Sequence, residues 1–357
     1  MCLLKNNLPK LLFFSSLLIM LKVLFLGEYP DFNAYYYSSM DRNILNYPPF
    51  VTILFGLFYF LPIIIASKVW IALSIFFLFA SLYLCFKLFK VQLTSSTVMI
   101  LSSLAFIYFP VKFTLGMGQL NLLVLLLIFL TFYFYIKDKD SYSGICLGIS
   151  LMLKLFPVLL LIYFLLLRKF KIFLCTIVTF ICLGGISYLI IKPEINNYYW
   201  QNLLPILDSV PVDYYNQALS GFLARSFDNI LLRNSLRIII SILLAISSFW
   251  IILKSKKRNF QRKALEFGLL ITLNVLINGY AWQHHFVWLI LPFLIIFFYI
   301  KDKKLGLSSY LILGISYLLT CVNLKNFTIY PALIQSHMFF GAILLWLMII
   351  YLLAKNV

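Results

Sequence analysis

The stretch that decides the fold is KIFLCTIVTFICLGGISYLII, residues 171–191, which carries no charge after Lys171. As an α-helix rising about 1.5 Å per residue, a run of this length crosses the ~30 Å hydrocarbon core of a bilayer. Arg168 and Lys169 precede it, and Lys192 follows it. Apolar runs bounded by basic residues recur along most of the chain. This pattern predicts a polytopic helical membrane protein.

The composition supports the same prediction. The 357 residues are 63% hydrophobic and 11% charged, whereas a soluble domain is about half apolar and about a quarter charged. A net charge of +18 does not indicate nucleic-acid binding, because the basic residues are spread in short clusters between apolar runs. The main clusters are residues 168–171, 254–263 and 301–304. Such clusters are typical of cytoplasmic loops, so we expect no nucleic-acid partner.

We expect a single domain over residues 1–357, with twelve spans and both termini in the cytoplasm. Residues 47–66 are apolar enough for another span, but a span there would turn the large basic loops outward. The segment is therefore predicted to form a re-entrant or interfacial helix pair in the first outer loop, entered at Pro48 and Pro49 and broken at Pro62. The fold class is all-α, with about 12 transmembrane helices. The long polar stretches near residues 27–48 and 192–233 are expected to be outer loops.

The polar residues gather at the outer ends of the predicted spans and could line one outward-facing cavity. They are Asp31, Tyr35, Tyr36, Gln119, Asn121, Lys154, Asn216, Gln217, Arg225, His284 and His285. Each also has a structural explanation: a loop carboxylate can be solvated, a lysine can reach the headgroups, and amides can bond between helices. Neighbouring histidines on a helix diverge by ~100° and do not form a metal-binding pair. We expect no metal site.

The order of several short motifs resembles glycosyltransferase family 87. The motifs are Asp31-x-x-x-Tyr35-Tyr36, Tyr47-Pro48-Pro49-Phe50, Gly118-Gln119-x-Asn121, Leu153-Lys154-Leu155-Phe156-Pro157, Asn216-Gln217-Ala218-Leu219-Ser220, Arg225 and His284-His285. This family comprises polyprenyl-phosphate-mannose-dependent mannosyltransferases with a GT-C membrane fold. The family often has serine shortly after Asn-Gln, where this chain has Ala218, with Ser220 two residues further on.

The resemblance implies an enzyme at the extracytoplasmic face that moves one sugar, with mannose as the family's commonest donor sugar. The donor would be a polyprenyl-phosphate-linked sugar held among membrane lipids, and the acceptor a glycan or glycolipid hydroxyl. Asp31 would be the general base of an inverting displacement, with Asp41 as the alternative in the same loop. Lys154 and Arg225, helped by His284 or His285, would face the leaving phosphate. No cofactor is required.

The resemblance implies that Tyr35, Tyr36, Gln119, Asn121, Asn216 and Gln217 would position sugar hydroxyls. The abundance of Lys, Asn, Ile, Phe and Tyr suggests an AT-rich bacterial genome, which would place the protein in the plasma membrane.

Other functions remain open at this point. A transporter or flippase predicts charges at mid-membrane and two related halves, and the sequence shows neither. A lipid-linked oligosaccharide polymerase or ligase would also suit the long loop 192–233. A membrane scaffold without catalysis would be insensitive to the loss of Asp31.

Overall fold

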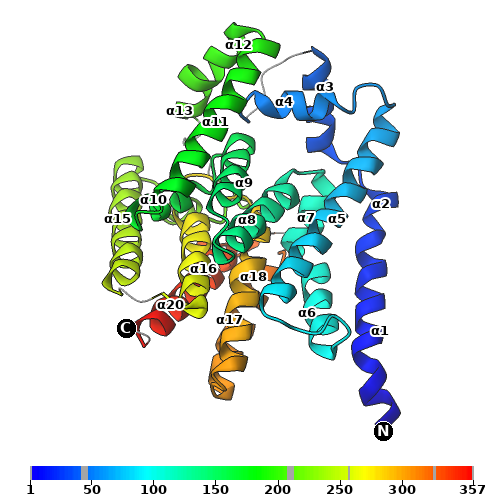
Figure 1. Ribbon diagram of the computed structural model, residues 1–357, viewed down its shortest axis with the longest axis vertical. Helices are drawn as coiled ribbons and strands as arrows, with labels where there is room; N and C mark the ends of the chain where they lie inside the picture. Colours follow the sequence, from blue (N-terminus) through cyan, green and yellow to red (C-terminus); the bar gives the residue numbers. More distant parts are fainter. Residues whose placement is uncertain (1, 42–46, 207–212, 256–257, 325–326, 356–357) are drawn as a thin grey trace. The chain divides into compact units, whose positions relative to one another are not determined.

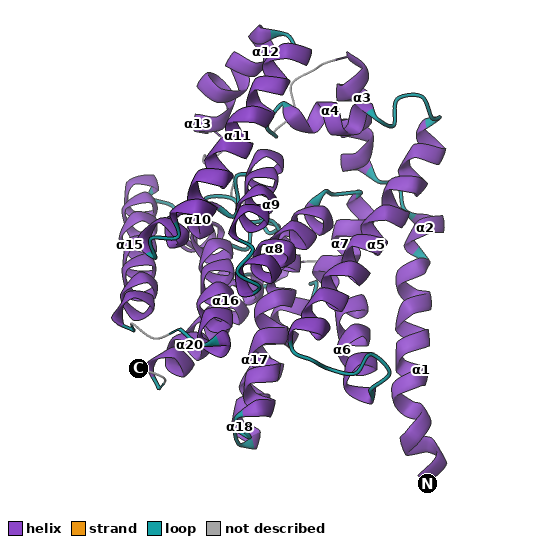
Figure 2. Cartoon of the chain, in the orientation of Figure 1, coloured by secondary structure: helices purple, strands orange, loops and turns teal. Residues whose placement is uncertain are grey.

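The computed structural model describes residues 2–41, 47–206, 213–255, 258–324 and 327–355. In these residues the secondary structure is helical apart from one isolated antiparallel bridge between Asn216 and Trp282 (Figures 1 and 2). The predicted all-α fold class is confirmed. The chain groups into two compact units, Met1–Leu155 with Leu174–Leu203, and Phe156–Phe173 with Leu204–Val357. The single domain over residues 1–357 stays a prediction.

The first unit contains most of the helices from the N-terminal half of the chain. They are α1 (Cys2–Leu21), α2 (Val23–Leu26), α3 (Pro30–Asp41), α4 (Phe50–Gly56), α5 (Ile63–Leu88), α6 (Ser96–Ile107), α7 (Phe109–Met117), α8 (Asn121–Ile136), α9 (Asp140–Leu153), most of α11 (Phe170–Ile190), α12 (Pro193–Tyr198) and a π-helical turn (Tyr199–Leu203).

The second unit contains the remaining helices. They are α10 (Val158–Leu166), α13 (Leu204–Ile206), α14 (Leu219–Ser226), α15 (Ile230–Lys254), α16 (Phe260–Ile277), a 3-10 helix (Gln283–Leu289), α17 (Ile290–Asp302), α18 (Leu307–Cys321), a short 3-10 turn (Phe327–Ile329), α19 (Ala332–Gln335) and α20 (His337–Ala354).

In the described part of the chain, six helical segments are long and apolar enough to cross a membrane. The pair α6 and α7, bent by 53°, would be a seventh, and α8, α9 and α18 are shorter apolar helices. The bend follows from Pro110 in the first turn of α7, since proline cannot continue the hydrogen-bonding of the preceding helix. The polytopic architecture is confirmed, and the number of twelve spans stays a prediction.

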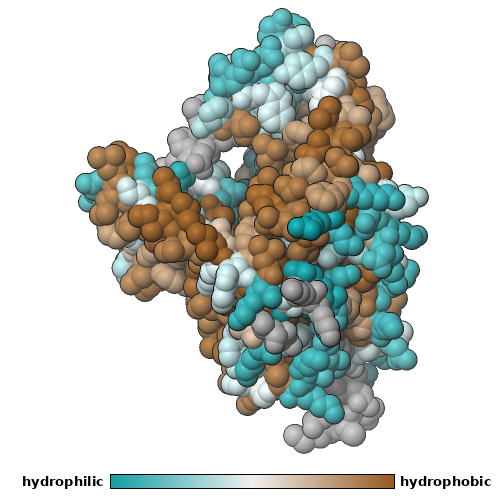
Figure 3. Space-filling model, turned by 60° about the vertical axis from the view of Figure 1, so that its left-hand side comes forward, coloured by the Kyte–Doolittle hydropathy of each residue, from teal (hydrophilic) through white to brown (hydrophobic). Residues whose placement is uncertain are grey.

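Several of these helices expose apolar side chains. On α15, Ile238, Ile242, Ile246 and Trp250 are each more than half exposed and recur every four residues along one face. Figure 3 shows broad areas of hydrophobic surface on the face that it presents. Such a surface is stable in contact with lipid chains and costly in water, which agrees with an integral membrane protein.

In the segment 47–66, predicted to be re-entrant or interfacial, one short separate helix is found: α4, whose seven residues are too few to cross a bilayer. The predicted break at Pro62 is found, because α5 begins directly after it at Ile63. The second helix of the expected pair is instead the first part of α5, because no helix-breaking residue separates Ile63 from the rest of α5. The long apolar helix α5 therefore begins inside the segment that was predicted to be re-entrant or interfacial.

Gly118 ends α7 in the left-handed conformation, with φ of 73°. A Cβ at this position would lie 2.6 Å from the Cβ of Phe32 in α3, so no larger residue fits the approach of the two helices. The carbonyl of Gly118 accepts a hydrogen bond of 2.9 Å from Nε1 of Trp70 in α5. This turn sets the direction in which the next residue, Gln119, leaves the helix.

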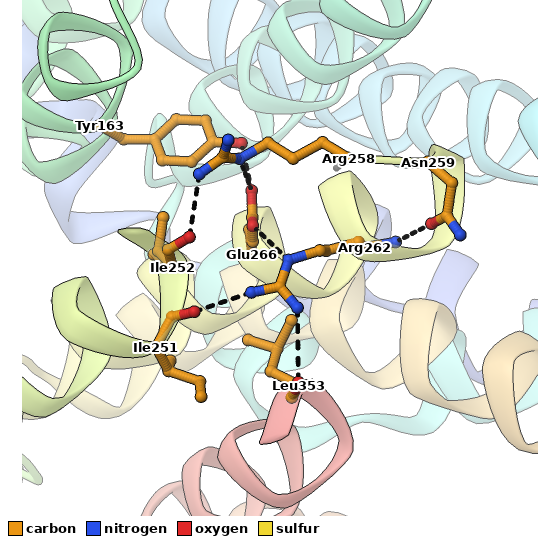
Figure 4. A network of polar contacts seen from close by, with 8 residues as sticks. All are labelled: Tyr163, Ile251, Ile252, Arg258, Asn259, Arg262, Glu266 and Leu353. Carbon is orange, nitrogen blue, oxygen red and sulfur yellow. Dashed lines mark hydrogen bonds and ion pairs between the residues drawn. The ribbon is translucent and has the colours of Figure 1, made fainter. Parts of the chain in front are cut away.

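A buried ion-pair network holds the helix ends of the second unit together (Figure 4). Glu266 on α16 accepts from Nε of Arg258 at 3.2 Å, Nε of Arg262 at 3.0 Å and the hydroxyl of Tyr163 at 3.0 Å. Arg262 also donates to the carbonyls of Ile251 at 2.7 Å and Leu353 at 3.4 Å. The network thereby links α10, α15, α16 and α20. None of its residues was among the predicted site residues.

Glu266→Gln should lower the free energy of unfolding of the detergent-solubilised protein by about 3 kcal/mol, because two arginine side chains would lose their anionic partner. Denaturant unfolding followed by circular dichroism measures the change. The matched control is Glu194→Gln, which alters an exposed carboxylate in α12 and should leave stability nearly unchanged. Equal stability of the two variants would contradict a stabilising role for the network.

Candidate active site

Asp31 and Gln119 lie 88 residues apart in the sequence and meet in the first unit. Asp31 is in the first turn of α3, and Gln119 follows the turn at Gly118. Nε2 of Gln119 donates a hydrogen bond of 2.5 Å to Oδ2 of Asp31. Because Gly118 packs on Phe32, the residue next to Asp31, the same close approach brings the two side chains together.

Two tyrosine hydroxyls donate to the other end of the same amide. Oε1 of Gln119 accepts from Tyr35 at 3.0 Å and from Tyr47 at 2.9 Å. Tyr35 lies one helical turn after Asp31, so α3 presents both side chains on one face. Burial raises the pKa of Tyr35 well above its ordinary value, and the nearby Tyr47 and Asp31 add to the rise. Tyr35 therefore remains protonated and able to donate.

Lys154 joins this group through Asn121 and Tyr47. Its Nζ donates a hydrogen bond of 2.9 Å to Oδ1 of Asn121, the first residue of α8. The same Nζ lies 5.1 Å from the centroid of the Tyr47 ring. Lys154 follows the last residue of α9 in an extended conformation.

We call Asp31, Tyr35, Tyr47, Gln119, Asn121 and Lys154 the Asp31 cluster.

The two charged groups of the cluster influence each other. Burial raises the pKa of Asp31, while the hydrogen bond from Gln119 and the charge of Lys154 lower it. Burial lowers the pKa of Lys154 to about 7, against the opposing effect of the Asp31 charge. The site therefore holds a carboxylate whose pKa lies above its ordinary value and a lysine whose charge changes near pH 7.

Other residues of the first outer loop have different surroundings. The hydroxyl of Tyr36, a predicted sugar-binding residue, donates to the carbonyl of Leu61 at 2.8 Å. Asp41, the alternative base, is the last residue of α3, and its side chain lies outside the described part of the chain. Tyr47 was quoted for its motif but not as a site residue, and Trp70 carried no sequence signal at all.

Arg225 forms a second polar cluster, in the second unit. Its Nη1 donates to the carbonyls of Asp213 at 2.7 Å and Asn216 at 2.8 Å. Its Nη2 and Nε donate to Oγ of Ser336 at 2.8 and 3.2 Å. Burial lowers the pKa of Arg225 to about 10, which leaves it charged at neutral pH. These bonds fasten the second long loop to the start of α20.

The amides of Asn216 and Gln217 are also bonded within the second unit. Asn216 Nδ2 donates to Ser220 Oγ at 3.2 Å, and that hydroxyl donates to the carbonyl of Gly279 at 2.7 Å. Gln217 Nε2 donates to the carbonyls of Tyr214 and Gln335, both at 2.7 Å. Ser220 thus takes part in the network although it stands two residues beyond the position usual in the family.

The two histidines lie at the start of the 3-10 helix before α17. Nδ1 of His285 accepts a hydrogen bond of 3.0 Å from the backbone N–H of Trp282, and the His285 ring stacks on Trp288 with centroids 5.2 Å apart. The rings of His284 and His285 meet edge to face at 4.5 Å. Within the described ranges, no three His, Cys, Asp or Glu side chains are grouped so that they could hold a metal ion.

The comparisons with known proteins agree with the motifs. The profile of glycosyltransferase family 87 matches residues 45–278, a range that includes Gln119 and Lys154 and excludes Asp31. The chain is also 25% identical over 248 residues to the polyprenol-phosphate-mannose-dependent alpha-(1-2)-phosphatidylinositol pentamannoside mannosyltransferase of Mycolicibacterium smegmatis. That similarity covers 69% of this chain and 59% of the relative. No solved structure matches the chain.

The predicted resemblance is thus confirmed on independent grounds. The profile match extends over more than half of the chain, and it takes in the Tyr-Pro-Pro, Gly-Gln-x-Asn and Asn-Gln motifs. The architecture, an all-helical chain with several apolar spans, is that of a membrane protein. The chain belongs to glycosyltransferase family 87.

Proposed function

We propose that this protein transfers a single mannose from a polyprenyl-phosphate donor to a hydroxyl of a glycan or glycolipid, at the extracytoplasmic face of a bacterial plasma membrane. The observation that carries the proposal is the Asp31 cluster, in which a carboxylate and a cation interact with each other and share one polar environment. The donor class follows the name of the mycobacterial relative, and the chain spans 59% of that protein's length.

The proposed reaction is a direct displacement with inversion. The acceptor hydroxyl attacks the anomeric carbon while the Asp31 carboxylate takes its proton. The bond between the anomeric carbon and the phosphate oxygen breaks, and the electron pair leaves with the polyprenyl monophosphate. One glycosidic bond forms as one sugar–phosphate bond is lost, so no oxidant or further reactant is needed.

Lys154 is proposed to stabilise the leaving phosphate. A phosphate monoester is a stable anion and needs no strong general acid, but negative charge develops on its bridging oxygen as the bond breaks. An ammonium group aimed at that oxygen stabilises the transition state more than the ground state. Nζ of Lys154 donates to Asn121 Oδ1 at 2.9 Å, and this neutral partner holds the ammonium group without cancelling its charge.

The second polar cluster, around Arg225, is proposed to have a structural role within the second unit. The contacts of Arg225 are with backbone carbonyls and the Ser336 hydroxyl, and they organise the second long loop. Asn216 and Gln217 make similar bonds to backbone groups. We therefore favour Lys154 over Arg225 as the group that contacts the donor phosphate.

The donor class can be tested with purified protein in lipid nanodiscs. Radiolabelled mannose on a short polyprenyl phosphate should be transferred to a lipid-extracted glycan acceptor, whereas nucleotide-linked mannose alone should give no product. The Asp31→Asn variant is the control, because any transfer that it supports does not depend on the proposed active site. Turnover with the nucleotide sugar alone would overturn the proposal, and transfer of a whole lipid-linked oligosaccharide would favour a polymerase or ligase.

A further inference from the structure

We propose that Gln119 is a positioning residue for the base: its amide, fixed by the hydroxyls of Tyr35 and Tyr47, holds the Asp31 carboxylate in the orientation that accepts a proton. The inference rests on the proposed function, because it takes Asp31 as the base. It gives Gln119 a different task from the sugar-binding role that the family resemblance implied.

The chemistry of the two side chains decides which way the amide faces. An ionised carboxylate can only accept hydrogen bonds, so the amide atom next to Asp31 must be Nε2, as found at 2.5 Å. A reversed amide would place Oε1 against a carboxylate oxygen, and the two acceptors would repel each other. The observed orientation therefore suits the charged form of Asp31.

The tyrosine hydroxyls secure this orientation from the other side. Both O–H groups point at Oε1 of Gln119, at 3.0 and 2.9 Å, and a carbonyl oxygen has two lone pairs to receive them. Tyr35 is buried and sits on the same face of α3 as Asp31. Asp31 and Tyr35, which holds the Gln119 amide in place, therefore lie on the same helix.

The backbone of Gln119 is held as well. Its N–H donates to the carbonyl of Thr114 at 3.0 Å, in the turn that closes α7. Gly118, in the same turn, is fixed by its contact with Phe32 and by the hydrogen bond from Trp70. The side chain of Gln119 therefore starts from a fixed point and ends in three hydrogen bonds, which is the condition for accurate positioning.

This arrangement has a consequence that a sugar-binding role would not have. A hydrogen bond donated to a carboxylate stabilises the ionised form over the neutral acid. Removing the donor removes one of the two effects that oppose burial and leaves the charge of Lys154 as the other, so the pKa of Asp31 should rise further. If Gln119 only contacted the sugar, its substitution would change the KM for the substrate and would not change the pKa of Asp31.

The experiment measures the titration of Asp31 in Gln119→Leu. Infrared spectra of protein labelled with ¹³C-aspartate are recorded against pH, and the Asp31→Asn spectrum is subtracted to isolate the Asp31 band. We expect the midpoint to rise by about one to two pH units, since a hydrogen bond to a charged group is lost. The acid limb of kcat/KM should move in the same direction. The double variant Tyr35→Phe and Tyr47→Phe should give a smaller rise.

Gln92→Leu is the matched control, because it removes an exposed glutamine from the loop after α5 and should leave both measurements unchanged. Gln119→Met replaces the leucine variant if that protein does not fold. An unchanged Asp31 titration in the Gln119 variant would overturn the positioning role. The infrared titration requires no turnover, so it remains decisive even if an active Asp31→Asn protein were to overturn the proposed function.

Discussion

Asp31→Asn should reduce the rate of sugar transfer by a factor of about 10²–10⁴, the usual contribution of a general base. Asparagine has the shape of aspartate and keeps an oxygen that can accept the hydrogen bond from Gln119, so the cluster should stay assembled. Its amide cannot take up the proton of the acceptor hydroxyl. We therefore expect kcat to fall while the donor still binds, which single-turnover and donor-binding measurements would separate.

The control for this prediction is Glu28→Gln, which neutralises an exposed carboxylate three residues earlier and should leave the rate unchanged. Asp41→Asn tests the alternative base in the same loop. An active Asp31→Asn protein together with an inactive Asp41→Asn protein would move the base from Asp31 to Asp41. Activity in both variants would contradict a carboxylate base in the first outer loop.

Lys154→Met should lower kcat/KM by a factor of about 10²–10³, because a cation that stabilises the developing phosphate charge is removed. Methionine is unbranched like lysine and fills similar space, so the effect reports mainly the charge. Lys192→Met is the control, since it removes an exposed lysine at the start of the second outer loop. An equal loss in both variants would indicate a general effect of surface charge.

The pH dependence gives a second measure of Lys154. Burial lowers its pKa to about 7, so the free protein loses this positive charge as the pH rises through that value. Asp31 imposes the opposite limit, because it must be ionised to accept a proton. We expect a bell-shaped profile of kcat/KM, with an alkaline limb that moves to higher pH in Lys154→Arg. An alkaline limb that stays in place would assign it to another group.

Much of the fold was readable from the sequence because membrane partitioning is local. A run such as residues 171–191 is apolar enough to enter a bilayer whatever the rest of the chain does, and its backbone must then be helical. The ends of elements were less predictable. The residues from Ile63 to Ala66 were expected in a separate helix, and they are the first part of α5. Nothing in the local sequence marks where a continuous apolar helix enters the membrane.

In the candidate site, too, the sequence predicted the residue types and the structure decided their contacts. The order of short motifs identified the family and selected Asp31, Gln119, Asn121 and Lys154, because the types of residue needed for phosphate and sugar chemistry are visible in the sequence. Only the tertiary structure decided which of them touch. Gln119 reaches Asp31 across 88 residues through a turn at Gly118 and the packing of α3 on α7. The Glu266 network was invisible for a related reason, since its residues come from four helices.

The sequence by itself therefore determined that this protein folds in a membrane and that its fold is helical. It also determined which types of polar residue lie outside the predicted spans. The structure decided the partners of each polar group, including the bonds that tie Arg225 to backbone carbonyls. The physical reason is the range of the interactions. Hydrophobic partitioning and helix formation depend on neighbours in the chain, whereas a hydrogen bond between side chains requires two distant segments to be placed within ~3 Å of each other.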